Sequence, residues 1–545
     1  MFSRSEPQID RAALASGIAV GVVGVVLLLL HILLLLNSGA FWRDECSSIL
    51  LAQAPSWQEM WNHLAIDSFP GLFVDCLRVW IQSGLGASDF GIRLLGILIS
   101  LGMLFSVFQS CRVMQVRFPL LALCLAGLNS VVFFVGSSIR AYGLAALLIV
   151  ACLAAFWRVA VQPTRCSTAA AFLLAVLSVH CNYQNSYLLF GIGVAAAAVA
   201  AMERKWMRSG LVLVMCFVAA LSMAVYLPAI SHYRSEIIVS NYRLSMEIIV
   251  ATLLDTMAAN GPWLLFGWFA GFFALVYVVA KGPREPSPGL YCLLAIVIAA
   301  VAGATFFKIG AMHPFPWHYI PFVAVCAVAI ECGIADRGPG GRLALGKILL
   351  ACYVAAVSLP AACSAAHLRR TNMDRVAATL EEKSRTNDLI LVEPYWLRPS
   401  FLKYYHGAAP WRIVPVDPDD PGSVWLGQVI SIKNIMAKPN SIQPTLDLVR
   451  KTLQGGGNVW IVGYVSPLPD GAQPPKLIPA PHPDYGWDNK VYSALWSQCL
   501  SCFLRAHAEK PESLVVRSNR PVDNIENVPL LLFHGWRDRK GPAEE

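Results

Sequence analysis

Long apolar runs recur along this chain at the spacing of membrane-spanning helices. Crossing the hydrocarbon layer of a bilayer takes about 20 apolar residues in a helix. Lipid offers no hydrogen-bond partners, so such a run must satisfy its own backbone by coiling. The sequence predicts about eleven spans, near residues 13–37, 91–110, 118–136, 143–160, 168–181, 187–202, 210–230, 263–280, 290–307, 320–335 and 348–364. We therefore expect a polytopic α-helical membrane protein.

Charged residues are too scarce for a soluble globule of this size. The 545 residues are 56% hydrophobic and only 14% charged. A formal charge of +8 could suit nucleic acid, but in a membrane protein the position of the basic residues matters more. Most of them fall in short loops between apolar runs. We expect membrane lipids around the chain and no nucleic-acid partner.

The basic residues also predict an orientation. Loops between alternate spans hold most of them, including Arg112 with Arg117, and Arg204 with Lys205 and Arg208. Such loops remain cytoplasmic in multi-pass proteins. The sequence thus predicts a cytoplasmic N-terminus and an external C-terminus, in the inner or plasma membrane of the cell.

The composition of the sequence changes near residue 365, where Asp, Pro, Gly and Lys become frequent. We expect residues 1–364 to form a transmembrane domain with a long first external loop at 37–90. Residues 365–545 should form a soluble α/β domain outside the membrane. Its predicted elements are a helix at 373–383, a strand at 388–392, a helix at 445–453 and a strand at 459–462.

Reactive side chains are rare inside the predicted spans and gather at their outer ends and in the outer loops. They include Asp44, Glu45, Asp67, Asp75, Arg140, His180, Lys308, His313 and His318. Helix ends in a bundle meet at one face, so groups distant in sequence can share a cavity there. The pattern predicts a site for a substrate whose apolar tail stays in the bilayer while its polar head reacts.

The segment Phe41 to Glu45 follows the first span directly. Its plain interpretation is an interfacial loop, with Trp42 as an aromatic anchor and Arg43 paired to an acid. Adjacent carboxylates on a regular element point in different directions. If the segment is catalytic, one acid of Asp44 and Glu45 should act as a base while the other orients it.

Three stretches of the first loop resemble the opening of GT-C glycosyltransferases that use polyprenyl-phosphate sugars, such as protein O-mannosyltransferases and lipid A aminoarabinose transferases. The stretches are Asp44-Glu45, Asp67-Ser68-Phe69-Pro70-Gly71-Leu72, and Ser88 through the pair Arg93-Leu94. Relatives usually carry His and Pro where this chain has Phe69 and Gly71. The departure weakens any metal-binding or hydrogen-bonding role for that His position.

Later motifs extend the resemblance over residues 13 to 365. Arg140-Ala141-Tyr142 resembles the Arg-x-Tyr of the family, and His180 with Tyr183 resembles its His-Tyr element. The stretch from Lys308 through His313 and His318 to Tyr319 occupies the place of an Arg-Tyr motif, with His318 standing for the Arg. Soluble external tails are usual in the family, and Phe401 to Tyr405 resembles an aromatic element found in them.

The resemblance implies transfer of a sugar from a polyprenyl-phosphate donor to an extracytoplasmic acceptor, which could be a glycan, a lipid or a protein. It gives catalytic roles to Asp44 and Glu45, with Asp44 as the base. Arg140 and Lys308 would bind the leaving phosphate. Asp67 could bind sugar hydroxyls, orient a base, or share a divalent metal with a histidine. The resemblance leaves the metal open and implies no nucleotide cofactor.

The predicted substrate-binding set is completed by Tyr142, His180, Tyr183, His313, His318 and Tyr319.

Two other classes of protein remain possible from the sequence. A lipid or solute transporter or flippase would need buried charges or broken helices near the middle of the bilayer. A non-catalytic envelope-assembly protein could keep the fold without the chemistry.

Overall fold

The computed structural model describes residues 11–232, 244–282, 285–310, 312–335, 341–417, 431–466, 468–469, 472–509 and 511–538. The chain divides into two compact units. Unit 1 comprises Met1–Leu36, Phe69–Tyr226 and Arg243–His367, and unit 2 comprises Asn37–Ser68, Leu227–Tyr242 and Leu368–Glu545. Most of the segment 37–90 therefore folds with the C-terminal residues.

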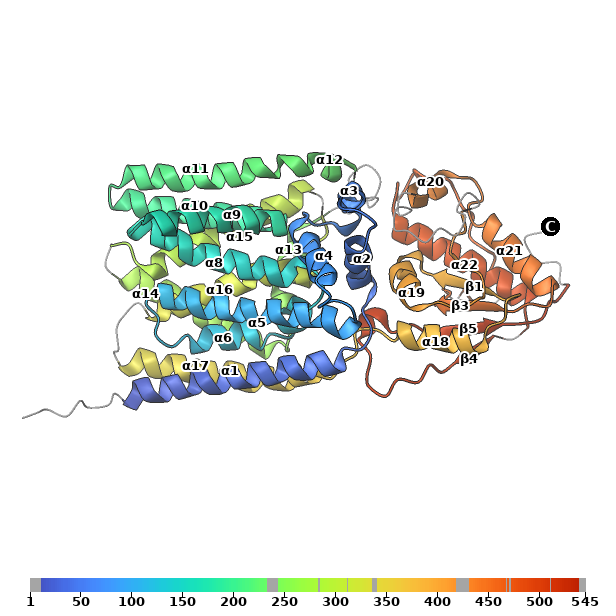
Figure 1. The fold of residues 1–545 in the computed structure, drawn as a ribbon, viewed down its shortest axis with the longest axis horizontal. Coiled ribbons are helices and arrows are strands. Elements are labelled where there is room, and N and C mark those ends of the chain that lie inside the picture. Colours follow the sequence, from blue (N-terminus) through green and yellow to red (C-terminus); the bar gives the residue numbers. More distant parts are fainter. Residues whose placement is uncertain are drawn as a thin grey trace, which may run out of the picture. The chain divides into compact units, whose positions relative to one another are not determined.

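Unit 1 is a bundle of helices that run side by side (Figure 1). Its long helices are α1 (Arg11–Asn37), α5 (Asp89–Val113), α8 (Ala141–Val161), α9 (Arg165–Cys181), α10 (Asn185–Met202), α11 (Trp206–Ser222), α14 (Trp263–Lys281), α15 (Pro288–Gly310), α16 (Ile320–Ala335) and α17 (Gly341–Ala366). The shorter ones are α4 (Leu72–Gln82), α6 (Leu120–Gly127), α7 (Ser130–Gly136), η2 (Met223–Tyr226), α13 (Met246–Met257) and η4 (Pro316–Tyr319).

Among the described residues, nine helices are long and apolar enough to cross a membrane. The prediction of about eleven spans differs from this number at two places. The predicted span 168–181 corresponds to α9, an apolar helix of 17 residues. The predicted span 118–136 is broken into α6 and α7, because the Asn129 side chain accepts a hydrogen bond from Val132 N (3.1 Å) and so starts a new helix.

Close backbone contact joins α10 and α15 in the bundle. A Cβ added to Gly191 of α10 would lie 2.7 Å from both the carbonyl oxygen of Ala295 and the nitrogen of Ala299. Real side chains do not fit at that distance, so glycine allows the two helices to touch. The same two helices line the apolar groove of unit 1.

One buried charge pair lies within the bundle. Glu331 of α16 is fully buried and meets Lys347 of α17, with 2.8 Å between Oε1 and Nζ. Its Oε2 also accepts a hydrogen bond from Ala122 N of α6 (3.0 Å). The pair joins three helices near their ends, and both of its charges are compensated.

Unit 2 contains a five-stranded sheet covered by helices (Figure 1). The strands are β1 (Leu389–Glu393), β2 (Trp411–Ile413), β3 (Val459–Gly463), β4 (Glu512–Leu514) and β5 (Leu530–Phe533). The helices are α2 (Arg43–Ala52), α3 (Trp57–Asn62), η1 (Leu64–Asp67), α12 (Leu227–His232), α18 (Met373–Lys383), η5 (Tyr395–Leu397), α19 (Arg398–Tyr404), α20 (Ser431–Ala437), α21 (Gln443–Gln454), α22 (Asn489–His507) and η7 (Asn524–Glu526). The predicted α/β character of the C-terminal region is confirmed.

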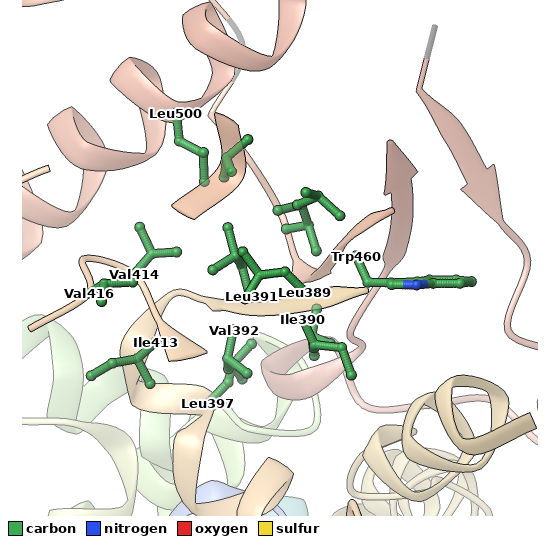
Figure 2. Close-up of a cluster of buried hydrophobic side chains, with 14 of the residues drawn as sticks. Leu389, Ile390, Leu391, Val392, Leu397, Ile413, Val414, Val416, Trp460 and Leu500 are labelled. Atoms are coloured by element: carbon green, nitrogen blue, oxygen red, sulfur yellow. The ribbon is translucent and has the colours of Figure 1, made fainter. Parts of the chain in front are cut away.

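The sheet has the order β2-β1-β3-β5-β4. Strands β2, β1 and β3 are parallel, whereas β5 and β4 are antiparallel to their neighbours. Every residue of β1 and β3 is buried, as expected for central strands covered on both faces. Figure 2 shows Leu391 and Val392 of β1 pointing to opposite sides of the sheet, each into apolar neighbours.

The last residues of β1 and β3 are paired, Glu393 with Gly463. Gly463 has a φ of +112°, and a Cβ built on it would lie 1.6 Å from the carbonyl oxygen of Glu393. Only glycine fits both the dihedral and the contact. The segment before β5 lies at the same edge, because Gly463 N donates to Pro529 O (2.9 Å).

This geometry predicts that Gly463→Ala destabilises unit 2. The left-handed backbone alone costs about 1–3 kcal/mol for a residue with a side chain, and the clash with Glu393 adds to it. Gly456→Ala is the matched control, because Gly456 also has positive φ (+74°) but no atom within 4 Å of the added Cβ. Thermal unfolding of the purified chain, followed by tryptophan fluorescence, should give a clearly lower midpoint for Gly463→Ala than for Gly456→Ala. Equal midpoints would contradict the role of the contact.

Candidate functional site

The acidic pair of the first loop lies in the first turn of α2, within unit 2. The Glu45 carboxylate turns back and accepts a hydrogen bond from Trp42 N (3.3 Å). Carboxylates in the first turn of a helix interact favourably with its free N–H groups. The sequence thus sets both acids at the favourable end of a short helix.

The two acids have different surroundings. Glu45 is fully buried, and its Oε1 lies 3.6 Å from Nε of Arg370, which is also buried. The side chain of Asp44 is 33% exposed and lies 3.5 Å from Nε of Arg43. Glu45 is therefore held inside unit 2, while Asp44 remains open to solvent.

Asp67 is also buried, at the end of η1. Its Oδ2 accepts a hydrogen bond from the Ser48 hydroxyl of α2 (2.9 Å). Ser48 follows Asp44 by four residues, so the bond attaches η1 to the helix that carries the acids. Of the three roles foreseen for Asp67, this contact favours orientation of the acidic helix.

C-terminal residues hold the start of α2 from several directions. The Phe41 N–H donates to the hydroxyl of Tyr404 on α19 (2.8 Å). The N–H of Arg43, which is the first residue of α2, donates to Oε2 of Glu526 in η7 (2.9 Å). Arg370 N donates to Ser38 O (2.9 Å). These bonds connect residues more than 300 positions apart in the chain.

The sequence prediction missed Arg370 and Glu526, although it noted the aromatic stretch containing Tyr404. Neither residue lies in a local motif, so nothing in the printed sequence distinguishes them from other charged residues of the C-terminal region. Their role depends entirely on long-range packing.

In unit 1, a second set of predicted residues comes together around Arg140. The Arg140 guanidinium carbon lies 4.7 Å from the centre of the Phe69 ring. Phe69 packs edge-on against Tyr142 (5.1 Å between centroids), and Tyr142 faces His318 (6.2 Å). Packing on a ring fixes the plane of a guanidinium and with it the directions of its N–H groups.

The two departures from the family motif have structural counterparts. Phe69, in place of the usual His, supplies the ring beside Arg140. Gly71, in place of the usual Pro, has an N–H that donates to the hydroxyl of Tyr226 (3.2 Å). Proline could not make that bond because it has no N–H.

His180 and Tyr183 gather around the same tyrosine. His180 Nδ1 lies 3.0 Å from the Tyr226 hydroxyl, and its Nε2 lies 2.9 Å from the Ser222 hydroxyl. The rings of Tyr183 and Tyr226 are 6.2 Å apart at right angles. Tyr226 was not predicted as a site residue, yet it connects Gly71, His180 and Tyr183.

The loop before α16 adds aromatic rings to the Arg140 cluster. His313 packs on Phe315 (5.3 Å between centroids), and Phe315 meets His318 edge-on (5.8 Å). His318 Nδ1 accepts a hydrogen bond from Phe315 N (3.2 Å), which leaves the proton on Nε2 of a neutral ring. His318 therefore behaves as a packed aromatic ring and does not replace the charge of the usual Arg.

Two predicted residues remain, Tyr319 and Lys308. The Tyr319 ring contacts Phe307 (5.5 Å between centroids). The Tyr319 hydroxyl donates a hydrogen bond to Ile249 O (3.0 Å), which ties η4 to α13. Lys308, near the end of α15, has an exposed side chain that enters neither the Arg140 cluster nor the Tyr226 cluster among the described contacts.

An apolar groove of about 840 Å³ lies on unit 1 between α10 and α15. Its walls are formed by Ser186, Tyr187, Phe190, Val297, Ile298, Val301, Ala302, Thr305, Phe306, Ile309 and Gly310. Tyr187 contacts Phe307 (6.2 Å between centroids), and Phe307 stacks on His318 (6.2 Å). A chain of rings thus runs from the groove to the Arg140 cluster.

Whether the protein holds a divalent metal depends on the donors that its described residues bring together. Within them, no group of three or more His, Cys, Asp or Glu side chains is arranged to hold a metal ion. Asp67 accepts a hydrogen bond from Ser48, His180 bonds to the Tyr226 hydroxyl, and His313 packs on Phe315. Among the described residues, these donors therefore do not form a metal centre.

Comparison with known proteins gives a structural likeness only. No protein-family model matches the chain, and no curated protein matches it. The crystal structure of apo ArnT from Cupriavidus metallidurans matches with a TM-score of 0.51 at 11% identity, covering 81% of this chain and 92% of that chain. The crystal structure of ArnT from Cupriavidus metallidurans bound to undecaprenyl phosphate matches with a TM-score of 0.50 at 11% identity, covering 95% of this chain and 98% of that chain.

A lower likeness, with a TM-score of 0.42, is to the archaeal oligosaccharyltransferase AglB from Archaeoglobus fulgidus, covering 82% of this chain and 69% of that chain. The fold class follows from the two ArnT comparisons. The chain is a multi-pass membrane protein with the fold of the GT-C glycosyltransferases, as the sequence predicted. At 11% identity the likeness establishes the fold alone.

The buried pair of Glu45 and Arg370 generates a stability prediction. Arg370→Ala leaves a buried carboxylate without its counter-charge, which typically costs about 3–5 kcal/mol. Arg375→Ala is the control, because Arg375 is half exposed and pairs with Asp374 at the surface (3.8 Å), where a pair contributes about 0–1 kcal/mol. Thermal unfolding should show a large drop in midpoint for Arg370→Ala and almost none for Arg375→Ala. A wild-type midpoint for both variants would refute the importance of the pair.

Proposed function

We propose that the protein is an integral membrane glycosyltransferase that moves a sugar from a polyprenyl-phosphate donor to an extracytoplasmic acceptor. The acceptor is a glycan, a lipid or a protein that offers a hydroxyl or amine. The observation that carries the proposal is the different environment of two adjacent acids on a GT-C fold. Glu45 is buried and paired, while Asp44 is accessible for proton transfer.

The groove of unit 1 supports a lipid-borne donor. An isoprenoid chain is long, apolar and flexible, and the groove between α10 and α15 offers it an apolar wall of comparable character. The chain of rings leads from the groove to Arg140, so a phosphate at the end of the lipid would meet a cation there. The ArnT structure bound to undecaprenyl phosphate has the same fold, which agrees with this use of the bundle.

Arg140 suits the phosphate because its guanidinium can form two parallel hydrogen bonds to one phosphoryl group. Packing on Phe69 fixes the plane of the guanidinium before a donor arrives. Lys308, exposed near the end of α15, would add a second cation. Tyr142, His313 and His318 would then surround the sugar and its phosphate with rings and hydrogen-bonding edges.

The reaction proceeds by direct displacement at the anomeric carbon. Asp44 accepts the proton of the acceptor O–H or N–H as the acceptor atom bonds to that carbon. The bond between the anomeric carbon and the phosphate oxygen breaks, and its electron pair leaves with the polyprenyl phosphate. Negative charge grows on that phosphate, so the cations stabilise the transition state more than the bound donor.

Chain continuity connects the two sets of residues. Asp67, which binds Ser48 of the acidic helix, is separated from Phe69 only by Ser68. Phe69 in turn packs on Arg140. We place the N-terminus in the cytoplasm and the residues after 365 outside the membrane, as the basic loops predict.

Asp44→Asn should abolish transfer without loss of folding. Asparagine keeps the size of the side chain but cannot take up the proton, and loss of general-base catalysis typically costs about 10²–10⁴-fold in rate. The measurement is transfer of radiolabelled sugar from a polyprenyl-phosphate donor by purified protein in nanodiscs. Glu59→Gln, an exposed acid of the same loop, is the control and should keep wild-type rates. Near wild-type turnover by Asp44→Asn would remove Asp44 from the role of base.

Arg140→Ala should chiefly damage use of the donor. A lost charge-assisted hydrogen bond costs about 1.5–3 kcal/mol, or roughly 10- to 150-fold in kcat/KM for the donor. Arg140→Lys, which keeps the charge but loses the planar fork, should fall between the wild type and Arg140→Ala. Donor titrations at fixed acceptor separate the three proteins. An unchanged donor dependence in Arg140→Ala would show that the phosphate binds elsewhere.

A further inference from the structure

Glu526 is a buried acid of the C-terminal region that contacts the first residue of the acidic helix. Its Oε2 accepts the hydrogen bond of Arg43 N at 2.9 Å, and its side chain is almost fully buried. The hydroxyls of Ser400 and Thr371 lie beside the carboxylate. An acid in this place satisfies one of the free N–H groups at the start of α2.

We propose that Glu526 is a positioning residue, whose ionised carboxylate fixes the first turn of α2 and thereby the direction of Asp44. This inference rests on the proposed function, because Asp44 is its base. It gives the C-terminal region a task within unit 2. That region holds the catalytic helix, and one of its contacts depends on a proton.

The proton matters because the two forms of the carboxyl group bind an N–H differently. A carboxylate forms a charge-assisted bond to the N–H and favours the positive end of the helix dipole. A protonated carboxyl group loses both advantages. Protonation of Glu526 should therefore loosen the first turn of α2 without breaking the fold.

The group titrates in the physiological range. Burial raises the pKa of Glu526 from its ordinary value to about 7, although the Arg43 N–H and charge and the Ser400 and Thr371 hydroxyls pull it down. The sign for stability follows from this raised pKa. The folded chain holds the proton more tightly than the unfolded chain, so the contribution to stability is complete below the ordinary pKa and declines as the pH rises through 7.

Other charged groups lie on the elements that pack against Glu526. They are Arg43, Asp44 and Glu45 on α2, Arg369 and Arg370 before α18, Arg398 and Lys403 on α19, and Asp523 at the start of η7. Of these, Glu45 is paired with Arg370, Arg369 is paired with Asp374, and Asp44 lies next to Arg43.

A positioning role predicts that transfer activity and the unfolding midpoint change in opposite directions with pH. Between pH 6 and pH 8 the ionised fraction of a group with a pKa of 7 rises about tenfold. Transfer activity that depends on ionised Glu526 should rise over that range, while the unfolding midpoint should fall. A purely structural acid would make activity follow stability.

The experiment compares the wild type with Glu526→Gln in nanodiscs from pH 6 to pH 8. It measures hydrogen exchange of the α2 amides relative to their intrinsic rates, the unfolding midpoint, and transfer of labelled sugar. We expect protection of the wild-type α2 to increase with pH while the midpoint decreases. In Glu526→Gln both trends should flatten, and the rise of kcat with pH should shrink from about tenfold to less than threefold.

Glu393→Gln is the matched control. Glu393 is a buried acid of the same unit, and burial raises its pKa well above the ordinary range although Ser497 opposes the shift. It ends β1 and lies beside Ser497 of α22. Glu393→Gln should change the pH dependence of stability but leave α2 exchange and transfer at wild-type values.

The exchange measurement needs no enzymatic activity, so it separates the two proposals. Wild-type pH dependence of α2 protection in Glu526→Gln would overturn the positioning role. If Glu526→Gln fails to fold, absence of any pH dependence of α2 protection in the wild type overturns it equally. If α2 behaves as expected but no form of the protein transfers sugar, the positioning contact stands and the proposed function is wrong.

Discussion

The burial of Glu45 beside Arg370 fixes the acidic helix within unit 2. A buried carboxylate is tolerated only with a counter-charge and hydrogen bonds, so this pair joins α2 firmly to the residues that follow the last membrane helix. Asp44, the residue before Glu45, must then point another way, and its side chain is partly exposed. Tyr404, Asp67 and Glu526 reinforce the same placement through bonds to residues in and around α2.

Much of the fold could be predicted because lipid imposes a simple rule on sequence. Apolar runs had to be helices, and the buried strands and the helix at 373–383 followed from local pattern. The break at Asn129 was missed, because an apolar window does not register one capping side chain. Arg370, Glu526 and Tyr226 were missed for a different reason, since their partners lie far away in the chain.

The candidate site was predicted unevenly. Asp44 and Glu45 were expected to divide their roles, because neighbouring side chains on a helix diverge, and their environments do differ. The reactive residues at the outer helix ends, from Asp44 to His318, were expected to share one cavity, and this stays a prediction. Within unit 1, ring contacts connect Arg140, Tyr142, His313 and His318. Phe69 and Gly71 were read only as departures from a motif. Their contacts with Arg140 and Tyr226 show a local compensation that a single sequence cannot reveal.

The central claim is that the membrane unit recognises a lipid through its phosphate. The most direct measurement is native mass spectrometry of the wild-type chain released from nanodiscs with equal amounts of polyprenyl phosphate and the matching polyprenol. We expect one bound polyprenyl phosphate per chain and little bound polyprenol. The apolar groove suits the chain of both lipids, so only a contact with the phosphate distinguishes them. Equal retention of both lipids would contradict phosphate recognition and, with it, the assignment of the donor.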